Sequence, residues 1–120
     1  MKPRIDGTEF GSITIDGKAF EHDVVIRPNG EVRKRKKKLS KAVHGTSHVV
    51  SLDEARHIFK KGAERLVLGS GQHGCVELSE EAADYFRQKG CRVEVSPTLE
   101  VARAWNDVKG AVIGLFHVTC

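Results

Sequence analysis

The spacing of hydrophobic residues changes near the middle of the chain. In the first forty residues apolar and polar positions alternate, as in 12–15 (SITI), and a short apolar run follows at 24–26 (VVI). Asp16-Gly17 and Asn29-Gly30 separate these runs, and both dipeptides tolerate the positive φ that tight hairpin turns require. The pattern predicts antiparallel strands at 12–15, 19–27 and 31–33.

From Ser51 onward the apolar residues recur at intervals of three and four, which indicates amphipathic helices. Three segments repeat one order: a hydroxyl residue, an acidic first turn, an amphipathic stretch, Lys-Gly and an apolar strand. Hydroxyls cap helix starts, the charges complement the helix dipole, and glycine ends a helix in the left-handed conformation. Ser51 and Glu54 also fit a reciprocal capping box. We predict helices at 51–61, 79–89 and 98–109, followed by strands at 66–68, 93–95 and 111–113.

The three later strands are apolar over their whole length, which is typical of a sheet covered on both faces. An α/β core with an added N-terminal antiparallel β part is therefore expected. A length of 120 residues suits a single domain over 1–120.

Composition and charge narrow the class of protein. A chain that is 39% hydrophobic and 30% charged is typical of a folded globule, and no apolar run approaches the length of a membrane span. The first ten residues lack the apolar core of a signal peptide, and the three cysteines form no Cys-x-x-Cys pair. We therefore expect a cytoplasmic protein with reduced thiols and no membrane partner.

Residues 68–74 (LGSGQHG) match the glycine spacing of a dinucleotide-binding loop. A strand precedes the loop, and Glu94 lies 20 residues after Gly74, at the spacing of the ribose-binding acid. However, the next helix begins only near Ser79 and has an acidic first turn, where a pyrophosphate would have to sit. No Gly-Lys-Ser/Thr follows either, which excludes a P-loop. We expect neither a nucleotide nor another cofactor.

The same loop remains the best location for a small polar ligand. It leaves a predicted parallel strand at its carboxyl end, where open α/β sheets place ligands. The candidate ligand-binding residues are Gly69, Ser70, Gly71, Gln72, His73, His48 and His117.

Histidine and cysteine residues lie close together in sequence, and both residue types can bind metal ions or act in catalysis. The pair His117 and Cys120 is three residues apart, which places the two on opposite sides of a strand unless the chain turns. No pair matches a zinc-finger framework, so we expect no metal ion. A nucleophilic Cys120 with His117 or His48 lacks a third, orienting group, so no catalytic residue is assigned and an enzyme is not favoured.

Residues 33–38 (RKRKKK) carry much of the net charge of +4. The run follows a predicted hairpin strand, and no aromatic residue is interleaved for stacking on bases. A solvated, charge-protected edge strand explains the run more simply than a nucleic acid partner. Its role is otherwise open.

Four stretches together resemble a small family of archaeal, bacterial and eukaryotic proteins. They are HDVVIRPNGEV, LSKAVHGTSHVVSLDEA, LGSGQHG and the final LFHVTC. The family includes an adipogenesis-associated protein and a mitochondrial complex I assembly factor. The resemblance implies a three-layer α/β fold with a mixed central sheet, and it implies no particular reaction or cofactor.

Two functions follow as hypotheses. The assembly-factor relative acts through protein association, so the first is a protein-interaction or assembly module with an unidentified protein partner. The alternative is a small polar-ligand binder or an enzyme that uses the glycine loop. One observation distinguishes the two hypotheses. Convergence of five side chains on one pocket would favour the ligand binder; these are Ser70, Gln72, His73, His48 and His117. The oligomeric state is not predicted.

Overall fold

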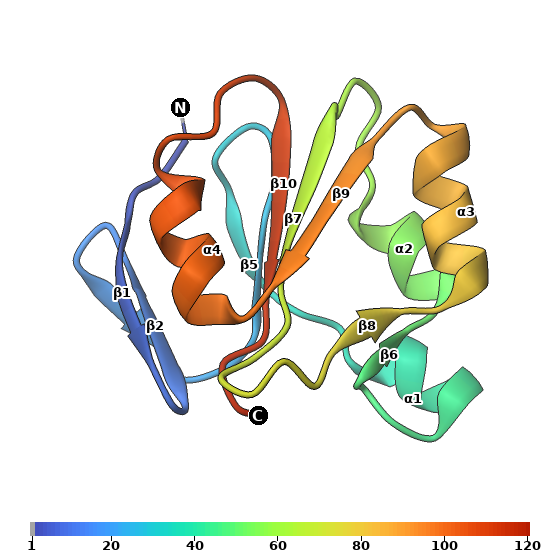
Figure 1. Ribbon diagram of the computed structural model, residues 1–120, viewed down its shortest axis with the longest axis horizontal. Coiled ribbons are helices and arrows are strands. Elements are labelled where there is room, and N and C mark those ends of the chain that lie inside the picture. Colours follow the sequence, from blue (N-terminus) through green and yellow to red (C-terminus); the bar gives the residue numbers. More distant parts are fainter. Residues whose placement is uncertain (1) are drawn as a thin grey trace.

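The computed structural model describes residues 2–120 and is built around a five-stranded mixed sheet (Figure 1). In spatial order the strands are β5 (Val32–Lys34), β4 (Val24–Ile26), β10 (Val112–Phe116), β7 (Arg65–Gly69) and β9 (Arg92–Ser96). The strands β10, β7 and β9 are parallel to one another. On the other side of β10, β4 pairs antiparallel with β10, and β5 pairs antiparallel with β4.

One face of this sheet is covered by a helix and a second, antiparallel sheet. The helix is α4 (Thr98–Trp105), and the second sheet consists of β1 (Ile5–Glu9), β2 (Ser12–Ile15) and β3 (Lys18–Phe20). Trp105 is fully buried, packs edge-to-face on Phe116 at 5.7 Å between ring centroids, and donates from its indole to the carbonyl of Pro3. This packing joins the N-terminal β part to the central sheet.

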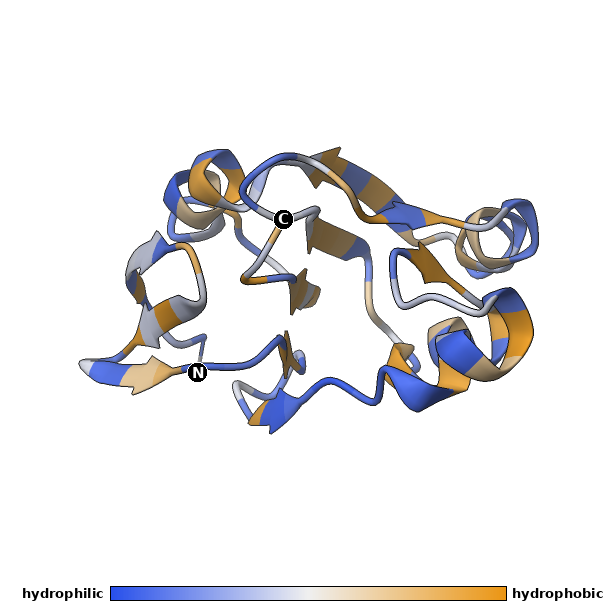
Figure 2. Ribbon diagram, turned by 90° about the horizontal axis from the view of Figure 1, so that it is seen from below, coloured by the Kyte–Doolittle hydropathy of each residue, from blue (hydrophilic) through white to orange (hydrophobic). Residues whose placement is uncertain are grey.

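The opposite face is covered by two helices and a small parallel sheet. The helices are α2 (Leu52–Ile58) and α3 (Glu80–Gln88), and the sheet consists of β6 (Val49–Val50) and β8 (Glu77–Leu78). A third helix, α1 (Lys38–His44), packs against α2 and β6. The core on this side centres on Leu66, Leu68, Ile58 and Phe86, all buried. The hydropathy colours of Figure 2 place the most apolar strands at the centre of the molecule. The expected three-layer α/β fold with a mixed sheet is thus confirmed. No helix in residues 2–120 is long and apolar enough to cross a membrane.

The helix starts and turns mostly agree with the local sequence. Ser79 caps α3 by accepting from the Ala82 N–H at 3.1 Å, and Asp16 and Gly17 both adopt positive φ between β2 and β3. Ser51 caps α2, but only half of the predicted capping box forms, because the Glu54 carboxylate turns into the core instead of back to Ser51. Thr98 is not a cap: it lies inside α4, and its hydroxyl donates to the His117 carbonyl.

Several predicted boundaries were wrong. The single strand expected at 19–27 is two strands in different sheets, β3 and β4, with Glu21 to Asp23 crossing between them. The helices α2 and α4 end before their Lys-Gly pairs, which lie in turns where Gly62 and Gly110 take positive φ. The elements β1, α1, β6 and β8 were not predicted, since they are short or lack a strong apolar period.

Arg35, in the middle of the basic run, is buried rather than solvated. Its guanidinium donates to Glu54 at 2.7 and 3.0 Å, to Asp23 at 3.0 Å and to the Ser47 carbonyl at 2.7 Å. Ser40 also donates to the Glu54 carboxylate. The Arg35 N–H donates to the Asp23 carbonyl at 3.0 Å, so the pairing of β5 with β4 continues one residue beyond β5 and brings the Arg35 side chain to Asp23. Arg35 is therefore not part of the solvated, charge-protected edge strand that the sequence predicted. One cation and two carboxylates thereby link β4, the basic run and α2.

Asp23, the other acid of this network, accepts hydrogen bonds from Arg35, from His117 and from the Val118 N–H. Burial disfavours its charged form, but hydrogen bonds from His117 and the Val118 N–H, with the nearby charge of Lys37, outweigh burial and lower its pKa from 3.8 to about 2. A carboxylate whose pKa is lower in the folded than in the unfolded state stabilises the fold at every pH at which it is ionised in both states.

We predict that Arg35→Ala lowers the free energy of unfolding by about 3–5 kcal/mol, because it leaves buried carboxylates without their cation. Urea denaturation measures the loss. The matched control is Arg33→Ala, which removes an exposed ion pair with Glu31 and should change stability by less than about 0.5 kcal/mol. Equal losses in the two variants would contradict a structural role for Arg35.

The stability difference between the wild type and Asp23→Asn is expected to depend on pH. The folded pKa lies below the unfolded one, so the carboxylate contributes fully above the unfolded value of 3.8 and loses its contribution as the pH falls to about 2. The contribution at neutral pH is about 2 kcal/mol. Denaturation midpoints of both proteins, followed from about pH 6 to about pH 2, should converge; a constant difference would be inconsistent with this origin.

Candidate functional site

One edge of the central sheet gathers most of the chemistry-bearing residues. The pairing register places Lys34, Val24, Phe116, Gly69 and Ser96 in one row across all five strands. In Figure 1 this is the lower edge, beside the end marked C. The residues that flank the row therefore meet although they are far apart in sequence, and the candidate site is built from them.

His117, directly after β10, lies between a carboxylate and a hydroxyl. Its Nδ1 is 2.7 Å from Asp23 Oδ2, and its Nε2 is 3.1 Å from Thr119 Oγ1. An ionised carboxylate can only accept, so Nδ1 donates to Asp23, and in that tautomer Nε2 is the nitrogen that can accept from the Thr119 hydroxyl. The order carboxylate, imidazole, hydroxyl can orient the ring and move a proton, and it supplies the orienting group that the sequence did not show.

A second histidine and the thiol of Cys120 lie next to His117. The rings of His48 and His117 meet edge-to-face at 5.5 Å between centroids, and His48 Nε2 is 3.6 Å from Cys120 Sγ. A hydrogen bond between the thiols of Cys75 and Cys120 raises the pKa of Cys75, with burial as a smaller contribution. His117 and Cys120 come to the same place because the strand ends at Phe116 and the chain turns.

The backbone N–H groups of the glycine loop are occupied within the protein. Residues 70–76 donate in turn to the Ser96 carbonyl, the Thr98 hydroxyl and the carbonyls of Thr119, Cys120, Gly71, Cys120 and Ser70. A phosphate-binding loop needs such donors to be free. A ligand at this loop would therefore be held by side chains.

The glycine at position 71 allows the end of the chain to approach the loop. Its φ is +103°, and a Cβ on it would lie 2.4 Å from the carbonyl carbon of Cys120 and 2.7 Å from the His117 ring. Only glycine combines this conformation with so close a contact. The loop thus holds residues 117–120 against the end of β7.

The structure brings together only some of the predicted ligand-binding residues. His48 and His117 touch, whereas the Gln72 amide is directed to Thr8 at 3.4 Å, Ser70 is buried and His73 is exposed. Gly69 and Gly71 contribute close backbone contacts. The convergence of all five side chains on one pocket, which would have favoured a ligand at the loop, is not observed.

A basic pocket of about 660 Å³ opens beside the same edge. Its wall is formed by the basic run after β5, the segment before β4 and the segment after β10. The lining residues are Glu21, His22, Asp23, Lys34, Arg35, Lys36, Lys37, Lys38, Val118 and Thr119. Lys37 Nζ lies 3.6 Å from Asp23 Oδ2. The pocket therefore brings the lysines of the basic run next to Asp23 and Thr119.

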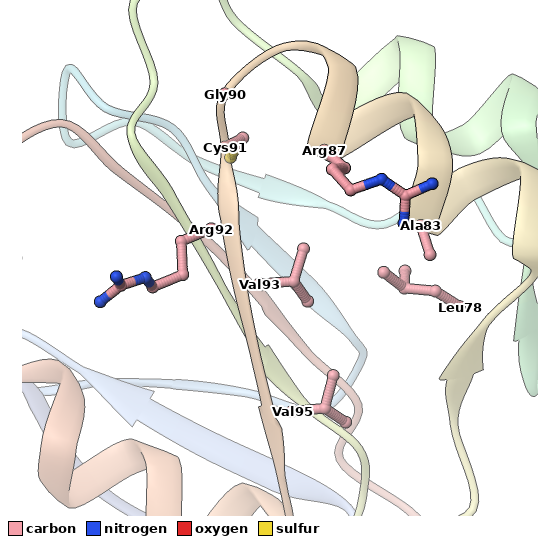
Figure 3. Close-up of a pocket in the computed structure, with 8 residues that line it drawn as sticks. All are labelled: Leu78, Ala83, Arg87, Gly90, Cys91, Arg92, Val93 and Val95. Atoms are coloured by element: carbon pink, nitrogen blue, oxygen red, sulfur yellow. The ribbon is translucent and has the colours of Figure 1, made fainter.

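A second pocket, of about 550 Å³, lies between β9 and α3. Figure 3 shows Val93 and Val95 pointing from β9 toward the side of Leu78 and Arg87, whereas Arg92 points the other way. The β9 strand is at the edge of the sheet, and within residues 2–120 its one strand neighbour is β7. The groove is therefore mainly apolar and runs along an open sheet edge.

Asp23, Arg35 and Thr119 were not predicted as site residues from the sequence. Asp23 is one acid in a hairpin region, Arg35 is one of six consecutive basic residues, and Thr119 stands near the end of the chain. The sequence signal that could have identified Asp23 is its position directly before a short, wholly apolar strand (VVI). An acid next to such a strand lies close to the buried core.

Comparison with known proteins supports the fold and the family. The family model described as "Protein of unknown function (DUF498/DUF598)" matches residues 5–112. A conserved hypothetical protein from Pyrococcus horikoshii has a similar structure, with 33% identity, a TM-score of 0.91 and coverage of 98% of this chain and 99% of that one.

Two further solved structures share the fold. A protein designated MT938 is 29% identical with a TM-score of 0.84, over 99% of this chain and 100% of its own. A Bordetella pertussis protein described as an Mth938-like domain is 16% identical with a TM-score of 0.64, over 97% of this chain and 85% of its own. The chain belongs to the DUF498/DUF598 family of proteins of unknown function.

Proposed function

We propose that the protein binds a small anionic molecule, carrying phosphate or carboxylate groups, in the basic pocket. The observation that carries this proposal is the concentration of cations around one cavity: Lys34, Lys36, Lys37 and Lys38 all line it. A volume of about 660 Å³ falls in the range of small-molecule sites. The proposal keeps the polar-ligand hypothesis but moves the ligand from the glycine loop to the basic run.

Three lysines of the pocket are available to bind an anion. Arg35 is occupied by Glu54, Asp23 and the Ser47 carbonyl, and Lys37 lies near Asp23. Within residues 2–120, Lys34, Lys36 and Lys38 take part in no ion pair, and all three are exposed. Like charges held close together repel one another, so a bound anion would relieve this repulsion.

The hydroxyl of Thr119 and the ring of His22 add hydrogen-bonding groups to the lysines. Both line the pocket, and His22 Nδ1 is anchored 3.0 Å from the Asp23 carbonyl. Such groups orient a ligand whose charge the lysines attract. Because the lysines line a cavity together with these groups, a small ligand fits better than a nucleic acid.

Binding of inorganic pyrophosphate, measured by calorimetry, provides a first test. The double variant Lys36→Glu/Lys38→Glu should weaken binding at least about tenfold, since two attractive charges become repulsive. The control Lys89→Glu/Lys109→Glu makes the same change in net charge away from the pocket and should retain the affinity.

Equal weakening in the two double variants would mean that net charge, not the pocket, attracts the anion, and would refute the proposal. A generic DNA duplex serves as a second probe. If it bound with a steep salt dependence and competed with pyrophosphate, a nucleic acid would replace the small ligand as the partner.

A protein-interaction module, related to the adipogenesis-associated and complex I assembly proteins, is the second candidate function. The observation in its favour is the apolar groove beside the open edge of β9 (Figure 3). Open strand edges bind extended peptides through main-chain hydrogen bonds, and apolar pockets select alternate side chains. The fitting partner is an extended segment with an apolar residue at every second position.

A labelled soluble peptide with valine at every second position should bind this edge, as measured by fluorescence anisotropy. Val95→Lys should weaken binding about tenfold, because it places a charge in the apolar groove. Leu99→Lys is the matched control: Leu99 is 48% exposed and Val95 47%, but Leu99 lies outside the groove. The same affinity for wild type and Val95→Lys would argue against the groove.

A further inference from the structure

We propose that His48, His117 and Cys120 form a binding site for a soft divalent transition metal ion of the zinc class. The three residues come from the segment before β6 and from the segment after β10. Their ligand atoms all lie within 4.8 Å of one another. This inference is independent of the anion pocket, which uses neither His48 nor Cys120.

The spacing of the donor atoms is close to that of a tetrahedral site. Zinc binds histidine nitrogen at about 2.0–2.1 Å and thiolate sulfur at about 2.3 Å, so neighbouring ligand atoms lie roughly 3.3–3.7 Å apart. The distance between His48 Nε2 and Cys120 Sγ is 3.6 Å. The remaining separations exceed the tetrahedral values by no more than about 1.5 Å, which side-chain rotation can close.

The surroundings of His117 are those of a metal-binding histidine. Its Nδ1 is held by Asp23 at 2.7 Å, which fixes the ring and leaves Nε2 as the nitrogen that can bind an ion. Ligating histidines almost always donate their other N–H to such a partner, which also makes the ligand more basic. Asp23 is itself held by Arg35 and the Val118 N–H, so the second shell is rigid.

The cluster is accessible from solvent. His117 is buried, but His48 and Cys120 are partly exposed, so an ion can enter. One thiolate and two imidazoles suit zinc or cobalt better than magnesium or calcium, which prefer oxygen ligands.

The metal site and a proton relay through Thr119 make competing use of one atom. His117 Nε2 either accepts from the Thr119 hydroxyl at 3.1 Å or binds the ion. The two soft donors of His48 and Cys120 favour the ion, because neither has a role in the relay. A test must therefore monitor the metal itself.

Titration of the reduced, metal-free protein with Co²⁺ provides this test. We expect one ion per chain, with the visible absorption of tetrahedral cobalt and a thiolate-to-cobalt charge-transfer band. Zn²⁺ should displace the cobalt and remove both features. Cys120→Ser should abolish the charge-transfer band, and His48→Ala should weaken binding about 100-fold or more.

The control is His73→Ala, which removes a histidine from the adjacent loop but not from the cluster; it should keep the spectrum and the affinity. Circular dichroism of each variant confirms that it is folded. A second-shell variant, Asp23→Asn, should weaken Co²⁺ binding about 10–100-fold while retaining the charge-transfer band. Binding without a thiolate band, or affinities unchanged in folded His48→Ala and Cys120→Ser, would overturn the proposal.

Discussion

The buried guanidinium of Arg35 is the constraint on which the site depends. A charge removed from water is tolerated only when it is paired and hydrogen-bonded, so Asp23 and Glu54 must both lie within reach. Asp23 precedes β4 and Glu54 belongs to α2, so one side chain links the sheet edge to the helical layer. Asp23, held in this way, then orients His117. The geometry of the histidine cluster is therefore a consequence of how the basic run is anchored.

The parts of the fold that could be predicted from the sequence are those decided within a few residues. The Asp16-Gly17 turn, the Ser51 and Ser79 caps, and the three strands after the helices depend on local propensity and period, and the structure confirms them. Helix ends were less accurate, since α2 ends at Ile58 and α4 at Trp105, several residues before their Lys-Gly pairs. The short strands β6 and β8 form by pairing with each other, and the local sequence of either segment does not predict this long-range pairing.

The candidate site was less predictable because its contacts are distant in sequence. His48 and Cys120 are separated by 72 positions, and Asp23 and His117 by 94. Arg35 carries the same charge as its neighbours, and only its buried position between Asp23 and Glu54 distinguishes it from the exposed lysines. His48 and His117 were recognised as candidates by residue type. Their contact could not be predicted, because it depends on the fold that places both residues at one edge of the sheet.

The glycine loop has a physical role different from the one that its spacing suggests. In a nucleotide-binding loop, glycines let the backbone approach a pyrophosphate, and the N–H groups face the ligand. Here the same freedom lets the backbone approach residues 117–120, and the N–H groups of His73 and Cys75 bind the Cys120 carbonyl. Cys120 and His117 are thereby positioned by the loop without any side chain of the loop touching a ligand. A pattern that resembles a binding motif thus serves to build the binding site next to it.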